Sequence, residues 1–154
     1  MLIQLAVMGM LAALLPLAIV WVSNDTGKYR KLIWVTLFLT FDLIMFGAFT
    51  RLTDSGLGCP DWPGCYGSAS PLGARDEIEA AQATLPSGPV THGKAWIEMV
   101  HRYLATAVGV LITVMAAMSW WLRQQRAAPV PSPWWATLTQ AWVIAQGAFG
   151  ALTV

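Results

Sequence analysis

The chain has 154 residues, of which 56% are hydrophobic and 11% are charged, and its formal net charge is +1. A composition this apolar, with nine tryptophans and so few charges, excludes an ordinary soluble domain. It is typical of a protein that crosses a membrane several times.

Four apolar segments are long enough to cross a bilayer as helices. At about 1.5 Å per residue, roughly 20 residues cover a hydrocarbon layer of about 30 Å, and a helix satisfies its own backbone hydrogen bonds there. We predict these spans at residues 1–22, 32–50, 95–122 and 134–154. The predicted fold class is therefore all-α, a polytopic membrane helical bundle with four transmembrane helices.

Lysine and arginine indicate the orientation of these spans. The basic residues gather in two short connections, 23–31 and 123–133, at Lys28, Arg30, Lys31, Arg123 and Arg126. Positively charged connections stay in the cytoplasm, so the long segment 51–94, with its mixed and slightly acidic charges, is predicted to face outward. Segment 1–22 is interpreted as an anchored span and not a signal peptide, because positive charge follows its apolar run.

The second predicted span carries a single charge, Asp42, near its middle. A carboxylate at that depth is costly and usually faces protein or water. We expect Asp42 to pair with a neighbouring helix, while proton transfer or a position near a cofactor stays open.

Both cysteines lie in the polar stretch GLGCPDWPGCYG, residues 56–67. Thiols pair on the oxidising side of a membrane, and the prolines and glycine between these two let the chain turn back, so we predict a disulfide between Cys59 and Cys65. So small a ring removes only about 2 kcal/mol of chain entropy from the unfolded state, which keeps its effect local. The spacing disfavours a metal site, and a reversible redox role stays open.

The rest of the polar segment is less informative. Residues 74–84 are predicted to form a short surface helix with solvated charges. No phosphate-binding motif or basic face for nucleic acid is visible, so no nucleic-acid partner is expected. His92, in the sequence THGK, is expected to be a loop or interfacial histidine, with a role as a second iron ligand the less favoured alternative.

The sequence KAWIEMVHRYLATAVGVL, at the start of the third predicted span, carries the candidate chemistry. Glu98 and His101 are three residues apart, so they share a helix face, which continues to Ala105 and Gly109. Small residues there leave a shallow groove that a flat macrocycle ligated by His101 would need, and neutral imidazole is a good iron ligand. The alternative is ordinary packing of small residues, with His101 hydrogen-bonded to a neighbouring helix.

Glu98 also has two interpretations. Lys94 and Arg102 lie four residues before and after it, and either could form an ion pair worth a few tenths of a kcal/mol if it is solvated. The functional alternative is a carboxylate one helical turn from a redox cofactor, where it accepts a proton or stabilises developing positive charge.

Three stretches together resemble the N-terminal half of haem A synthase: FGAFTRLTDSGLGCPDWPGCYG, PVTHGKAWIEMVHRYLATAVGVL and QGAFGALTV. This membrane enzyme oxidises a methyl group of haem O to the formyl group of haem A. The resemblance covers about residues 46–154. It implies that His101 is an axial ligand of the haem iron, that Glu98 is the catalytic glutamate, and that Cys59 and Cys65 are the cysteine pair of a periplasmic loop in a bacterial inner membrane.

The resemblance also implies an oxidoreductase acting on CH or CH2 groups, with water as the oxygen source and with haem b in a C-terminal half. The chain would be half of a tandem four-helix-bundle enzyme with one extra leading helix, 1–22. Since it ends at residue 154, before the family's second histidine, we expect it to be a truncated chain that is inactive alone.

Expected partners are haem O, membrane lipid, haem O synthase, oxidase assembly factors and further copies of the same chain. Two other functions stay open at this stage. One is a b-type cytochrome-like fragment that transfers electrons through haem at His101. The other is a non-catalytic membrane assembly protein.

Overall fold

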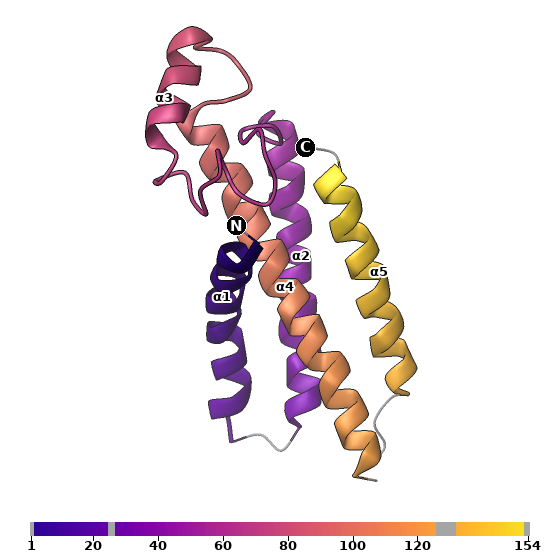
Figure 1. Ribbon diagram of the computed structural model, residues 1–154. Helices are drawn as coiled ribbons and strands as arrows, with labels where there is room; N and C mark the ends of the chain where they lie inside the picture. Colours follow the sequence, from indigo (N-terminus) through magenta and orange to yellow (C-terminus); the bar gives the residue numbers. More distant parts are fainter. Residues whose placement is uncertain (1, 25–26, 126–131, 153–154) are drawn as a thin grey trace.

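The computed structural model describes residues 2–24, 27–125 and 132–152, and these residues form helices joined by loops, without a β-strand (Figure 1). This confirms the all-α class. The helices are α1 (Leu2–Val22), α2 (Lys28–Leu52), α3 (Arg75–Thr84), α4 (His92–Gln124) and α5 (Pro133–Leu152). The short helix predicted at residues 74–84 is α3.

Two helices begin earlier than the sequence pattern predicts. α2 begins at Lys28, so it includes the basic residues that the sequence pattern placed in a connection. The Lys28 ammonium donates to the carbonyl oxygens of Val20 and Trp21, at 3.2 and 2.8 Å. These are carbonyls that the end of α1 leaves without a helical partner. α4 begins inside the predicted loop because the Thr91 side chain caps it, accepting the Lys94 N–H at 3.3 Å.

The longest helix, α4, organises the bundle. It contacts α1, α2, α3 and α5, and α1 also contacts α2 (Figure 1). Within the described residues α2 and α5 touch α4 but not each other. A buried cluster between α1, α2 and α4 forms the core of this region, at Ala13, Val20, Leu32, Ala107 and Leu111.

Two of the helices, α2 and α4, are long and apolar enough to cross a membrane, judged by length and composition. α2 also exposes large apolar side chains, including Trp34, Phe38 and Phe41, as expected of a surface that faces lipid. These two helices are typical of a membrane protein. The spans at residues 1–22 and 134–154 stay a prediction.

Asp42 has no partner on a neighbouring helix within the described residues, so the expected pairing is not found there. Its side chain is exposed on α2, and in the described part of the chain it makes no hydrogen bond or ion pair. Asp42 follows Val35 by seven residues and Leu39 by three, so it lies on the side of α2 that carries these packed residues, but at its level that side is exposed.

The contact between Gly9 of α1 and Thr106 of α4 leads to a prediction. A Cβ added to Gly9 would lie 2.2 Å from Cγ2 and 2.6 Å from Cβ of Thr106, atoms close to the α4 backbone that have little freedom to move. We expect Gly9→Ala to lower the free energy of unfolding in detergent by about 1–3 kcal/mol, the usual cost of overpacking. Gly147→Ala on α5 is the matched control, because a Cβ there meets nothing within 4 Å. Equal stability of the two variants would contradict this packing.

Candidate active site

The loop between α2 and α3, residues 53–74, lies over the N-terminal part of α4; we call it the disulfide loop (Figure 1). A disulfide joins Cys59 to Cys65, as the sequence predicts, and both cysteines are fully buried against Ala95 and Met99 of α4. The loop can come this close because residue 58 is glycine: a Cβ there would lie 2.5 Å from the Lys94 carbonyl carbon. Loop and helix therefore form one packed unit.

A buried ion pair joins the disulfide loop to α4. Oε2 of Glu98 accepts the Cys59 backbone N–H at 2.7 Å, and Oε1 accepts a hydrogen bond from the Arg102 guanidinium. The two side chains are only 5% and 8% exposed. The predicted pairing of Glu98 with Arg102 is therefore present, but it is buried and not solvated, so it belongs to a costlier class of interaction.

Arg102 also holds the far side of the disulfide ring. Its Nη1 atom donates to the carbonyl oxygens of Asp61 and Gly64, at 2.7 and 2.6 Å. The Asp61 carboxylate in turn accepts the backbone N–H groups of Tyr66 and Gly67, at 2.6 and 2.8 Å. The guanidinium is thus shared between a carboxylate on its own helix and the backbone of the loop.

Sequence reasoning gave Arg102 no more weight than Lys94 as a partner for Glu98. In the structure Lys94 instead forms an ion pair with Asp54, with Nζ and Oδ2 3.2 Å apart. The available signal was position: Arg102 lies deeper in the apolar part of the helix, where an isolated charge is costly and a buried partner is needed.

His101 faces α2 and not the disulfide loop. Its half-buried imidazole stacks on the Phe46 ring, with centroids 6.4 Å apart and planes inclined by 13°. A Cβ added to Gly47 would lie 2.9 Å from Nε2. In the described chain neither ring nitrogen has a hydrogen-bond partner. Glu98 and His101 are thus neighbours along α4 whose side chains contact different parts of the protein.

Ala105 and Gly109 continue along α4 from His101, and both are partly buried. A Cβ added to Gly109 would meet nothing within 4 Å, so there is clearance beside the helix at that turn. The His101 imidazole, whose two nitrogens lack partners among the described residues, provides the donor that a haem iron needs. The clearance beside Gly109 leaves room for the haem ring next to the helix.

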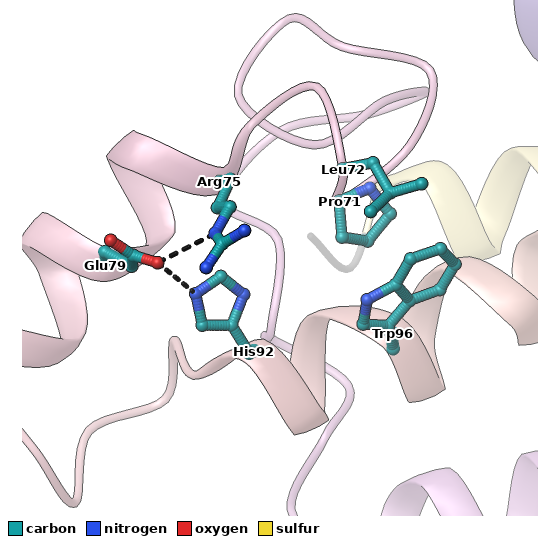
Figure 2. Close-up of a pocket in the computed structure, with 6 residues that line it drawn as sticks. All are labelled: Pro71, Leu72, Arg75, Glu79, His92 and Trp96. Carbon is teal, nitrogen blue, oxygen red and sulfur yellow. Dashed lines mark hydrogen bonds and ion pairs between the residues drawn. The ribbon is translucent and has the colours of Figure 1, made fainter.

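His92 lies in a separate pocket of about 270 Å³ beside α3, which we call the α3 pocket (Figure 2). Its other lining residues are Pro71, Leu72, Arg75, Glu79 and Trp96. His92 Nε2 is 3.6 Å from Glu79 Oε1, an ion-pair distance that is too long for a hydrogen bond. His92 is nine residues before His101 on the same helix, roughly 14 Å along its axis, so the two imidazoles are not brought together.

Known proteins resemble most of this chain. Residues 30–154 match the family model COX15-CtaA, described as cytochrome oxidase assembly protein. "Heme A synthase" of Shewanella oneidensis is 40% identical over 124 residues, which are 80% of this chain and 36% of that protein. "Heme A synthase" of Agrobacterium fabrum is 30% identical over 109 residues, 64% of this chain and 30% of that protein. No solved structure matches.

Fold and site together define an α-helical membrane protein whose disulfide-closed loop is anchored to one helix by a buried ion pair. The family match then identifies it further: the chain belongs to the COX15-CtaA family of cytochrome oxidase assembly proteins. It spans about a third of the length of the curated relatives it matches.

The buried pair predicts strong coupling between its two residues. Arg102→Gln leaves the Glu98 carboxylate buried without its cation, so we expect the free energy of unfolding to fall by about 3–5 kcal/mol. Combining it with Glu98→Gln should cost clearly less than the sum of the two single substitutions, measured as a double-mutant cycle in detergent. Arg75→Gln, which breaks an exposed pair, is the control and should have little effect. Additive costs for Glu98 and Arg102 would contradict the coupling.

The α3 pocket gives a pH-dependent prediction. Arg75 donates a hydrogen bond to Glu79 at 2.9 Å and places a positive charge beside it, which lowers the pKa of Glu79. A lowered folded-state pKa favours the folded state above the usual glutamate pKa of about 4.3, and this contribution is lost as the pH falls through the lowered value.

Arg75→Gln should therefore raise the pKa of Glu79, followed by NMR titration of its labelled side-chain carboxyl carbon. An unchanged titration midpoint would mean that the ion pair does not form in solution.

Proposed function

We propose that this chain is the N-terminal module of a haem A synthase, a haem-modifying oxidoreductase whose substrate is haem O. One observation carries the proposal: α4 combines His101, whose ring nitrogens lack protein partners in the described structure, with the buried carboxylate of Glu98, inside the residues that match the family. The names of the relatives supply the reaction. Because those relatives are more than twice as long, the complete activity requires more protein than this chain.

In this proposal His101 is the axial ligand of the substrate iron, and the macrocycle lies along Ala105 and Gly109. When bound and oxidised, haem O supplies a ring methyl group that is acidic and electrophilic by conjugation. The clearance beside Gly109 supports this position, since a larger side chain there would occupy the space that a flat ring needs.

Glu98 would accept the methyl proton, stabilise developing positive charge or orient the attacking water. Both of its oxygens already accept hydrogen bonds, from the Cys59 N–H and from Arg102. Each oxygen keeps a second lone pair, so the carboxylate can accept a proton or hold a water while these contacts keep it in place. Arg102 is held in turn by the Asp61 and Gly64 carbonyls.

The remaining features of the proposal concern the whole enzyme. We infer four transmembrane helices in this half, with the disulfide loop on the periplasmic side of a bacterial inner membrane. Lys28, Arg30, Lys31 and Arg123 lie at the opposite end of the bundle, whereas segment 51–94 carries more acidic than basic residues. Haem b in the C-terminal half would take the electrons away, and water would supply the oxygen. Haem O is the partner that the site residues would contact directly.

A second function has one observation in its favour. Because Glu98 is held by the disulfide loop and Arg102 whereas His101 faces α2, His101 could hold a b-type haem for electron transfer without the carboxylate acting on the ring. Chemical analysis of extracted haem separates the two functions, since only the first converts a methyl group to a formyl group.

The test is to express this chain with the C-terminal half of the Shewanella oneidensis relative in membranes that contain haem O. The unsubstituted pair of chains should produce haem A, detected by mass spectrometry of extracted haem. Glu98→Gln should lower the conversion rate by about 10²–10⁴-fold while haem O still binds, because it removes a proton acceptor and keeps the shape. His101→Ala should abolish binding at this site.

Glu79→Gln is the matched control, because it removes a carboxylate in the α3 pocket, away from His101, and should leave conversion unchanged. Normal haem A production by Glu98→Gln would refute the role of the glutamate. Failure of the unsubstituted chains to produce haem A would contradict the proposed function as a whole.

A further inference from the structure

Two adjacent residues near the C-terminal end of α2, Phe46 and Gly47, surround the imidazole of His101. We propose that they are positioning residues: Gly47 sets how far the imidazole reaches toward α2, and Phe46 sets the plane of its ring. The inference rests on the proposed function, in which His101 is the axial ligand. It adds two residues of a second helix, 54 and 55 positions before His101 in sequence, to the ligand site.

Gly47 acts through the space that it leaves. A Cβ at this position would lie 2.9 Å from Nε2, 3.6 Å from Cδ2 and 3.8 Å from Cε1 of His101. The atoms in the way are the far end of a side chain that can rotate, and not helix backbone. Gly47→Ala would therefore leave α2 packed on α4 and move the imidazole instead. The contacts of Gly9 and Gly58 differ, because there the obstacle lies at or close to the α4 backbone.

Phe46 acts through its flat face. Its ring is inclined by only 13° to the imidazole, and it also contacts the Phe49 ring, with centroids 5.9 Å apart and planes tilted by 47°. Turning the imidazole out of this plane would drive it into the Phe46 ring. Offset parallel stacking of aromatic rings is itself weakly favourable, so the contact holds the ring in one orientation.

Packing takes the place of a hydrogen bond at this ligand. A metal-binding histidine usually donates its second ring N–H to a carboxylate, a carbonyl or water, and that contact fixes the ring. No such protein partner is found for His101 among the described residues, so the two α2 contacts are what orients it. Substitution of hydrogen-bonding outer contacts typically costs 10- to 100-fold in metal affinity, and we expect a loss of the same order when these packing contacts are changed.

A test without haem comes first. The chain has two histidines, so labelling histidine with 13C and 15N gives two sets of ring resonances, and His92 serves as an internal reference in the same spectrum. In detergent micelles, Gly47→Ala and Phe46→Leu should shift the His101 ring resonances and leave those of His92 in place. Gly147→Ala, where an added Cβ meets nothing within 4 Å, should shift neither set.

The second test is a titration of the same variants with ferric protoporphyrin IX. Gly47→Ala should bind about 10- to 100-fold more weakly than the parent chain and should change the Soret band and the EPR g-values, with unchanged helicity and unfolding midpoint. Phe46→Leu should change the g-values, and Phe46→Tyr, which keeps the ring, should restore them. A structural role alone would alter stability without changing these spectra.

The outcomes separate the two proposals. If His101→Ala loses the porphyrin while Gly47→Ala and Phe46→Leu bind it with parent affinity and spectra, the positioning inference is overturned and the ligand assignment stands. If His101→Ala binds like the parent, or the parent does not bind, the proposed function fails at this site. In that case the NMR comparison still tests the contact between Gly47 and His101. Unshifted His101 resonances in Gly47→Ala would show that this contact is absent and would overturn the positioning inference.

Discussion

Two opposite charges buried near the start of α4, Glu98 and Arg102, connect the disulfide loop to the helix bundle. Removing them from water is costly, and the cost is met only because their remaining polar atoms find partners: the carboxylate accepts the Cys59 N–H, and the guanidinium donates to the carbonyls of Asp61 and Gly64. The ion pair therefore needs the docked loop, and the loop needs the ion pair.

This arrangement divides the Glu-x-x-His motif between two tasks. One helical turn separates Glu98 from His101, yet the carboxylate is engaged with the loop whereas the imidazole lies against Phe46 and Gly47 of α2. α4 contacts every other helix of the described structure. A substitution where α4 meets the disulfide loop and a substitution where it meets α2 therefore both act on the same helix.

Local sequence signals predicted the elements and the disulfide, because apolar length, the turn residues between the cysteines and the charges of α3 act over short distances. The choice between Lys94 and Arg102 was missed: depth in the apolar part of α4 favoured Arg102, but the groups that hold the two side chains, Asp54 and the loop carbonyls, lie about 40 residues away in sequence. Gly47 gave no signal, because its contact with His101 exists only where α2 meets α4. The pairing of Asp42 was not found because the sequence does not tell at which level along α2 another helix covers it.

Hydrogen–deuterium exchange at the Cys59 backbone amide tests the central claim most directly, because that N–H is the donor to the buried Glu98 carboxylate. In the parent chain this amide should exchange far more slowly than that of the exposed Leu57, and Arg102→Gln should remove most of the protection by releasing the loop. A Cys59 amide that exchanges as fast as Leu57, or that is equally protected after Arg102→Gln, would contradict the account.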